Sequence, residues 1–364
     1  MSGRRLLDSL DYSTLLAVLG LVGVGVLTIA SATLDEAGRD GLWQRQLLWL
    51  AVGVVAAAVV FFIDYHVWAE FSLLLHGLVM VLLVAVLFVG TEIGGNRSWL
   101  VLGPFRLQPS ELAKWTTCLV LATYLAKRLR GNIGLYEMIV MGVLVGAPLA
   151  LIALQPDFGT ALIFVPIYLA AILLGGLRWK VMVGLLIAGL LFTPVLWFQL
   201  EDYQQERILS VLDTKRDPQG VGYQAEQSKI AIGSGGMVGK GVFEGTQSQL
   251  NFLPAQHTDF ILAVLAEELG FFGALVVLGL FYYLIYRAIL ASRSSQDRLG
   301  TYICLLVAAW ITGQMAINVG MVLGVLPTIG VPLPFISYGG SALVAVCCGV
   351  GLVLNVRGRR FVNI

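Results

Sequence analysis

The sequence predicts an all-α polytopic membrane protein with about ten transmembrane helices. Of its 364 residues, 58% are hydrophobic and only 12% are charged. The mean hydropathy of +0.86 is far above that of a soluble domain of this length. Apolar runs recur from one end of the chain to the other, which excludes a soluble domain with a single anchor. Many of these runs reach about 20 residues, the length that crosses the hydrocarbon core of a bilayer.

The ten predicted spans, in chain order, are residues 13–33, 44–63, 70–90, 110–126, 137–155, 158–176, 181–199, 259–286, 300–324 and 339–356. The first resembles a signal peptide, but it has span length and lacks a convincing cleavage site, so we interpret it as a retained helix. All spans are expected to form one membrane domain over residues 1–364.

Residues 200–258 form a long connection between spans seven and eight. Its first half is charged and its second half is rich in glycine. Connections of this length are usually functional or disordered. Because residues 225–232 are amphipathic, we expect the second half to fold onto the outer membrane face as an extracytoplasmic cap.

Arginine and lysine predict the orientation, because they accumulate in cytoplasmic connections. With ten crossings, the basic clusters all fall on one side: Arg4 and Arg5; Lys127, Arg128 and Arg130; Arg178 and Lys180; Arg287, Arg293 and Arg298; and Arg357, Arg359 and Arg360. The short opposite connections hold only Arg39, Arg45, Arg97 and Arg106. Both termini are therefore expected in the cytoplasm. The connection 64–69 has no lysine or arginine and supports this orientation least.

The remaining composition excludes several kinds of site. A net charge of +1 gives no indication of nucleic-acid binding. The four cysteines all lie in apolar runs without CxxC spacing, so we interpret them as core residues. The three histidines, including His257, are far apart in the sequence and show no zinc-ligand pattern.

Charged residues in apolar spans cost about 2.5–3.5 kcal/mol each on insertion scales, so each is a candidate functional residue. Glu111 and Lys114 begin span four in QPSELAK, and their i,i+3 spacing puts them on one helix face. Asp157 begins span six in QPDFGTAL, Asp259 begins span eight, and Arg97 precedes span four. The topology places all five near the outer interface. The alternatives are an interfacial ion pair for the first two and helix N-caps for the two aspartates.

Two further charged sites are less easily interpreted. Glu267 and Glu268 are expected about 12 Å deeper than Asp259, at 1.5 Å per helical residue, and we favour a structural role for them. The stretch GSGGMVGKG resembles a phosphate loop, but Gly241 replaces the required serine or threonine and the first glycine is missing. Its glycines are expected in tight turns, and contact of Lys240 with a phosphate is the alternative.

Two classes of protein fit a charged site at the outer face. An enzyme acting on a lipid-linked substrate needs a carboxylate where headgroup and water meet. A transporter needs paired charges near the midplane, between inverted repeats. The interfacial position favours the enzyme, while the related starts QPSE and QPDF of spans four and six keep the transporter open.

Four separated motifs resemble the SEDS family (shape, elongation, division and sporulation) of bacterial peptidoglycan glycosyltransferases. They are GGNRSWLVLGPFRLQPSELAK, QPDFGTAL, GSGGMVGKGVFEGTQSQLNFLPAQHTDFILAVLAEELG and GVPLPFISYGGSAL. The resemblance runs in order over nearly the whole chain. Within the family it is strongest to the members that act in cell elongation.

The resemblance implies a reaction and its residues. Family members polymerise lipid II into glycan strands at the outer face of the cytoplasmic membrane and release undecaprenyl pyrophosphate. The family's essential aspartate matches Asp259, which acts as general base or organises the site. The implied substrate-binding residues are Glu111, Lys114, Arg97, Trp99, Asp157, Lys240, His257 and Thr258. Of these, Lys114 and Arg97 suit a pyrophosphate, and Trp99 either stacks on a sugar or belongs to the interfacial aromatic belt.

The resemblance also implies partners. A leaving pyrophosphate favours a divalent cation such as Mg²⁺, held jointly with substrate, and no organic cofactor is expected. A class B penicillin-binding protein transpeptidase and other cell-elongation machinery are the expected protein partners. The alternatives are a lipid II flippase or lipid-linked-sugar transporter, and a non-catalytic scaffold.

For Glu267 and Glu268 we expect pairing with Gln314 or Asn318 of span nine.

Overall fold

The computed structural model describes residues 10–34, 41–93, 96–103, 105–128, 133–177, 220–250 and 252–360, with isolated positions between 181 and 209. Its long helices are α2 (Tyr12–Ala32), α3 (Leu42–Phe62), α5 (Ser72–Val89), α6 (Pro109–Arg128), α7 (Leu135–Ala153), α14 (Ile261–Arg293), α15 (Arg298–Val322) and α16 (Gly340–Gly358). The short α8 (Phe158–Leu162) and α9 (Phe164–Leu174) together fill predicted span six. Every predicted span thus has its helix except 181–199, which lies almost entirely outside the described residues.

Seven of the described helices are long and apolar enough to cross a membrane. The helix α6 has the length but not the hydropathy, because charged residues and threonines interrupt it. It packs against α5, α15 and α16, so its polar side chains face protein rather than lipid. The chain is therefore a multi-pass membrane protein whose most polar spanning helix lies in the interior.

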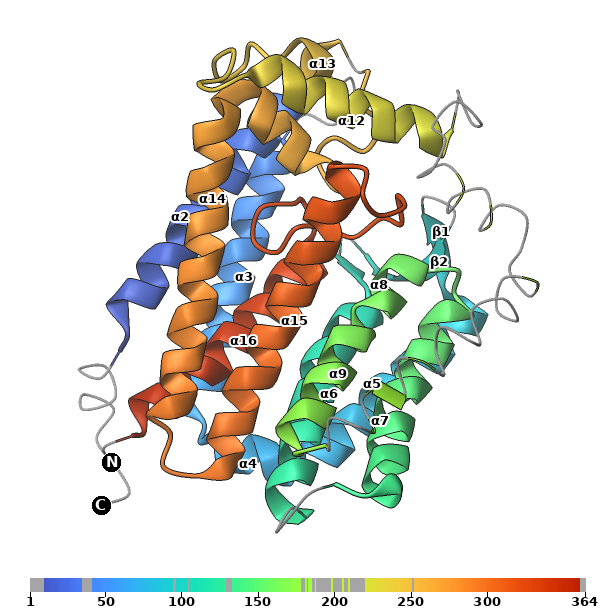
Figure 1. Cartoon of the computed structure of the whole chain (residues 1–364), viewed down its shortest axis with the longest axis vertical. Helices are drawn as coiled ribbons and strands as arrows, with labels where there is room; N and C mark the ends of the chain where they lie inside the picture. The colour runs from blue at the N-terminus through green and yellow to red at the C-terminus, as the bar shows by residue number, and fades with distance from the viewer. Residues whose placement is uncertain are drawn as a thin grey trace.

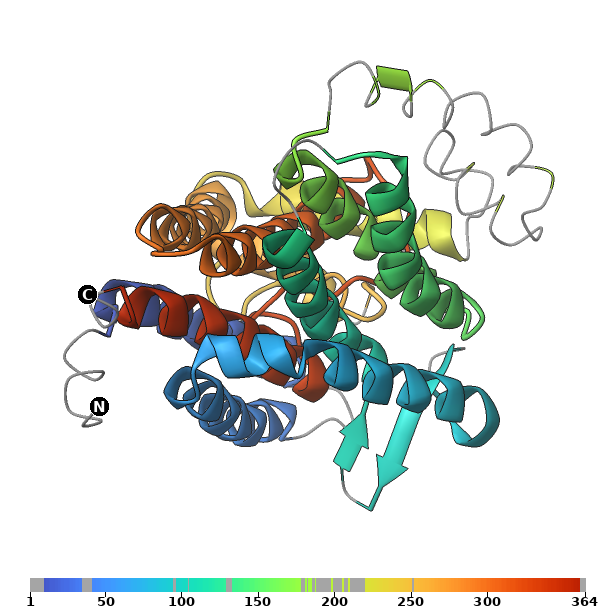
Figure 2. The same cartoon turned by 90° about the horizontal axis from the view of Figure 1, so that it is seen from below.

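The helices form two groups that meet along α6 (Figure 1). One group contains α2, α3, α14, α15 and α16, and the other contains α5, α6, α7 and α9 (Figures 1 and 2). Contacts of α15 with α6 and α9, and of α16 with α6, join them. Within the first group α3 and α16 approach closely, because a Cβ atom at Gly351 would lie only 2.9 Å from the Ala57 carbonyl oxygen.

One end of the bundle carries the extramembrane structure. The helices α12 (Val221–Gly235) and α13 (Thr246–Gln249) lie across this end (Figure 1), as expected for the second half of the 200–258 connection. A three-stranded antiparallel sheet, β1 (Thr91–Ile93), β2 (Asn96–Leu102) and β3 (Phe105–Leu107), precedes α6. No strand was predicted from the sequence. The aromatic and β-branched residues of β2 favour one once a neighbouring segment can pair with it.

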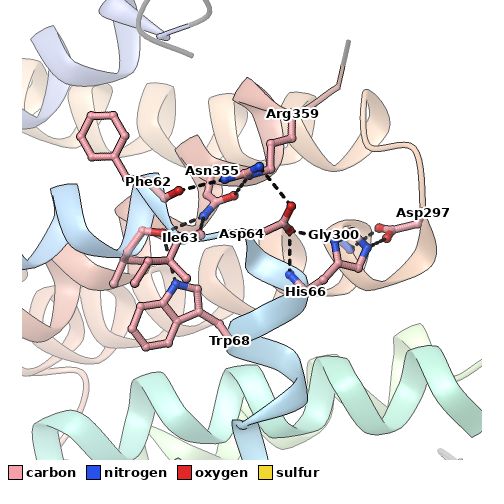
Figure 3. A network of polar contacts seen from close by, with 10 residues as sticks. Phe62, Ile63, Asp64, His66, Trp68, Asp297, Gly300, Asn355 and Arg359 are labelled. Carbon is pink, nitrogen blue, oxygen red and sulfur yellow. Dashed lines mark hydrogen bonds and ion pairs between the residues drawn. The ribbon is translucent and has the colours of Figure 1, made fainter. Parts of the chain in front are cut away.

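The opposite end is held together by ion pairs. Asp64 binds Arg359 at 3.0 Å, and His66 bridges Asp64 and Asp297 at 2.9 and 2.7 Å (Figure 3). These contacts join the short helix α4 (Tyr65–Glu70) to the α14–α15 connection and to the end of α16. The connection 64–69 therefore lies at the end where α16 finishes, as the predicted topology requires.

The helix α14 changes direction at Gly270, whose φ of 67° and ψ of −167° are not helical. The Phe271 N–H donates to the Gly236 carbonyl at 2.9 Å, and a Cβ atom at Gly270 would lie 2.3 Å from the Gly239 nitrogen. A glycine is therefore required there. Residues 261–269 form a short arm beneath the cap of α12 and α13, and only the part after Gly270 runs along the bundle (Figure 1).

Candidate active site

Asp259 lies in a half-buried turn immediately before α14. The N-cap of α14 is Phe260, so the interpretation of Asp259 as an N-cap is wrong. Its backbone carbonyl accepts a hydrogen bond from Asn318 Nδ2 at 2.9 Å. On the other side, a Cβ atom at Gly330 would lie 3.4 Å from a carboxylate oxygen of Asp259. The carboxylate thus lies against the connection between α15 and α16, with His257 and Thr258 beside it in the same turn.

Glu111 and Lys114 form the predicted pair, with 2.7 Å between Lys114 Nζ and Glu111 Oε2. The side chains of lysine and glutamate are only 0% and 2% exposed, so the ion pair is buried inside the protein, and its position at the membrane interface stays a prediction. The ammonium group also donates to Gln314 Oε1 at 3.3 Å and lies 5.7 Å from the ring centroid of Trp310. A buried cation with a carboxylate, an amide and an aromatic face around it is largely compensated for its lost hydration.

Asp157 lies close to this pair. Its carboxylate caps α8 by accepting from the Thr160 N–H at 3.2 Å, which confirms the N-cap interpretation. The other oxygen accepts from Gln108 Nε2 at 2.9 Å. Asp157 is buried and interacts electrostatically with Glu111 and Lys114. The structure therefore brings the charged starts of predicted spans four and six into one buried cluster.

Two amides of α15 connect this buried cluster to the Asp259 turn. Gln314 holds Lys114 and donates to the Pro332 carbonyl at 2.8 Å. Asn318, one helical turn later, donates to the carbonyls of Asp259 and Val331 at 2.9 and 2.7 Å. Their i,i+4 spacing in an apolar span was a readable signal of one polar helix face. Gln314 and Asn318 were instead predicted as partners of Glu267 and Glu268.

Glu267 and Glu268 lie elsewhere than predicted. Glu267 binds Lys240 Nζ at 2.7 Å and Glu268 accepts from the Ser31 hydroxyl, so pairing with Gln314 or Asn318 was wrong. The predicted depth was wrong as well, because the arm carrying both residues lies against the cap loop. The N–H of Lys240 donates to the Glu267 carbonyl at 3.0 Å. The bend at Gly270, which a straight-helix count cannot anticipate, causes the difference.

Arg97 and Trp99 lie on β2 in the connection before α6. Arg97 is exposed, and its Nε donates to the Gly90 carbonyl at 3.0 Å. Trp99 is half-buried and pairs with Thr91 of β1. The sheet contacts α5 and α6 through β2 and α16 through β3. The substrate-binding roles of Arg97, Trp99, His257, Thr258 and Lys240 stay predictions.

Among the described residues, no group of three histidine, cysteine or acidic side chains is arranged to hold a metal ion. The buried carboxylates Glu111 and Asp157 already have protein partners. A cation at this site would therefore take most of its ligands from substrate phosphates and water. Mg²⁺ commonly binds in this way.

Comparisons with known proteins agree with this architecture. A family model described as the cell cycle protein FtsW/RodA/SpoVE matches residues 10–360. The chain is 40% identical over 353 residues to the peptidoglycan glycosyltransferase MrdB of Escherichia coli K12, covering 96% of this chain and 94% of MrdB. It is 38% identical over 367 residues to a probable peptidoglycan glycosyltransferase FtsW of Coxiella burnetii, covering 96% of each chain.

Solved structures show the same fold. A chain from a study of the structural coordination of polymerization and crosslinking by a peptidoglycan synthase complex aligns with a TM-score of 0.83 and 32% identity, over 97% of this chain and 99% of that one. The rod shape determining protein RodA of Thermus thermophilus aligns with a TM-score of 0.72 and 29% identity, over 97% and 98%. The chain therefore belongs to the FtsW/RodA/SpoVE family, the SEDS family of peptidoglycan glycosyltransferases.

Proposed function

We propose that this peptidoglycan glycosyltransferase polymerises lipid II at the outer face of the bacterial cytoplasmic membrane during cell elongation. Its similarity to MrdB over 96% of the chain is the observation that carries the proposal. The arrangement of charges supports it, because neighbouring amides of α15 hold both the buried Lys114 and the backbone of the turn that carries the half-buried Asp259. The orientation that we propose places both termini in the cytoplasm, with the cap of α12 and α13 facing outward.

In the proposed reaction a hydroxyl of the acceptor sugar attacks the anomeric carbon of the donor. The new glycosidic C–O bond forms as the bond from that carbon to the pyrophosphate oxygen breaks. Asp259 takes the hydroxyl proton and later returns it to water. Lys114 supplies positive potential toward the departing pyrophosphate, either directly or through Gln314. A divalent cation such as Mg²⁺ would neutralise charge on the pyrophosphate when bound.

The proposed protein partner is a class B penicillin-binding protein transpeptidase. The synthase-complex structure, whose aligned chain shares this fold, concerns polymerization and crosslinking together. A polymerase coupled to a transpeptidase would hand new strands directly to the crosslinking enzyme. Other elongation proteins are expected in the same assembly.

The test uses purified protein and its cognate transpeptidase in liposomes with lipid II and Mg²⁺. We expect glycan polymer from the wild type and a loss of at least about 100-fold with Asp259→Asn, because the amide cannot accept the proton. Asp297→Asn, at the opposite end of the bundle, is the matched control and is expected to keep its activity. Thermal melts establish equal folding.

Equal polymer from Asp259→Asn and the wild type would remove Asp259 as the base and direct attention to Glu111 and Asp157. No polymer from the wild type, with a control polymerase active in the same mixture, would overturn the proposed activity. Movement of lipid II between leaflets without new glycosidic bonds would then favour the transporter.

A further inference from the structure

The turn that carries Asp259 is held from outside at three consecutive backbone carbonyls. The His257 carbonyl accepts from the Tyr338 N–H at 2.9 Å, and the Thr258 carbonyl accepts from Ser337 Oγ at 2.6 Å. The Asp259 carbonyl accepts from Asn318 Nδ2 at 2.9 Å. Each donor comes from α15 or from the connection that follows it. A turn fixed at three successive peptide units has little freedom to rotate.

The turn needs such support because its own backbone is strained. Ala255 has a φ of 50°, in the left-handed region that a residue with a Cβ atom rarely adopts. Its carbonyl accepts the N–H groups of Thr258, Asp259 and Phe260, so this unfavourable conformation starts the turn. Strained residues of this kind persist where the surrounding structure holds them, and they cluster at functional sites.

Ser337 is the central group of the support. Its hydroxyl donates to Thr258 and accepts from the Leu333 N–H at 2.7 Å. Ser337 is only 5% exposed, so water cannot readily replace either bond. An alanine at this position would leave the Thr258 carbonyl without this donor while changing little volume.

Gln46 of α3 holds the same connection from a different part of the bundle. Its Nε2 donates to the Ser337 carbonyl at 3.1 Å, and its Oε1 accepts from the Gly339 N–H at 3.3 Å. Gln46 is fully buried at 0% exposure. Its amide thus binds the backbone on both sides of Tyr338, the residue whose N–H holds His257. A buried glutamine that satisfies a donor and an acceptor of one loop specifies that loop's position.

We propose that Gln46, Ser337 and Asn318 form a cradle that orients the Asp259 turn, and that Gln46 and Ser337 are positioning residues for glycosyl transfer. This inference rests on the proposed function of Asp259. The cradle acts through the backbone, so it fixes where the carboxylate points without touching substrate. Misplacing a reacting group by about 1 Å can cost about 100-fold in rate, and a loosened turn should cost part of that.

The test compares Ser337→Ala with Ser337→Thr, which keeps the hydroxyl. The matched control is Ser228→Ala, because the buried Ser228 hydroxyl also donates to a distant backbone carbonyl, that of Val322, at 2.8 Å. Gln46→Met, which keeps the side-chain volume, is the second variant should Ser337→Ala fold poorly. Rates are measured against lipid II concentration, and hydrogen exchange is followed at amides 255–260.

We expect Ser337→Ala and Gln46→Met to lower kcat about tenfold with KM within twofold of the wild type. The amides of the turn should exchange faster than in the wild type. Ser337→Thr should restore the rate, and Ser228→Ala should lose thermal stability without these changes.

Two results would overturn the cradle. The first is unchanged hydrogen exchange at residues 255–260 in both Ser337→Ala and Gln46→Met. The second is a kcat of these two variants that equals the kcat of Ser228→Ala. A wild type that makes no polymer would overturn the proposed function instead. The exchange measurement would still decide whether the cradle holds the turn.

Discussion

Two glutamate–lysine pairs in this protein have the same 2.7 Å separation and different surroundings. Glu111 and Lys114 lie on one helix, and both side chains are almost fully buried. Glu267 and Lys240 join the α14 arm to the cap loop, and the lysine is 26% exposed. Glu267 has several other donors, including Thr246 Oγ1 at 3.1 Å and the Gln247 N–H at 3.0 Å.

The comparison shows that separation alone does not give the role of an ion pair. The number of alternative partners and the access of water decide what is lost when one member is removed. Lys114 is the only cation within hydrogen-bonding distance of Glu111 among the described contacts. Glu267 keeps neutral donors whether or not Lys240 is present. We therefore interpret Glu111–Lys114 as part of the active site. We interpret Glu267–Lys240 as a structural contact that holds the cap of α12 and α13 against the α14 arm.

The largest predicted effect is that of Lys114→Met. It leaves the buried Glu111 charge uncompensated, which should lower the free energy of unfolding by about 3–5 kcal/mol. The double variant Lys114→Met, Glu111→Gln should recover most of this stability while remaining inactive. Thermal melts in detergent measure both. A single variant as stable as the wild type would show that Glu111 is held by groups other than Lys114.

Lys240→Met should have an intermediate effect. The remaining donors to Glu267 limit the loss to about 1.5–3 kcal/mol, the range for one hydrogen bond to a charged group. If the Glu267–Lys240 pair only holds the cap in place, KM for lipid II should stay unchanged. Lys229→Met, at an exposed lysine of α12, is the control for charge. A raised KM with normal stability would instead support contact between Lys240 and a substrate phosphate.

The ion pairs of His66 with Asp64 and Asp297 are more exposed than both glutamate–lysine pairs, because 46% of the His66 side chain is exposed. Burial by itself would lower the pKa of His66, but the hydrogen bonds and charges of the two aspartates outweigh it and raise that pKa above 6.5. The protonated form is therefore stabilised on folding. Its contribution is complete below about pH 6.5, the unfolded value, and is lost as pH rises through the folded value.

His66→Gln tests this dependence, because glutamine keeps hydrogen-bonding groups but carries no charge. The wild type should be more stable than the variant at pH 6, by less than about 1 kcal/mol because the pair is exposed. The difference should disappear at pH 9 and shrink in high salt. Melts at both pH values measure it, and a constant difference would mean that the protonation of His66 does not contribute.

Much of the candidate site was predictable because its signals are local. The motifs around Glu111, Asp157 and Asp259 mark the starts of predicted spans, and an i,i+3 spacing was enough to predict the Glu111–Lys114 pair. The partners across the bundle were not predictable. The bond from Asn318 to Asp259 joins residues 59 positions apart, and no periodicity encodes such a contact.

The sequence by itself determined the membrane class, the order of the described spans and the choice of charged residues, because apolar run length and the cost of intramembrane charge depend on composition. Only the tertiary structure decided which charges are buried together. The bend at Gly270 turned Glu267 and Glu268 toward the cap, and the packing of α15 brought Gln314 and Asn318 to the site. These outcomes depend on helix packing and on one glycine conformation, which act between segments distant in the chain.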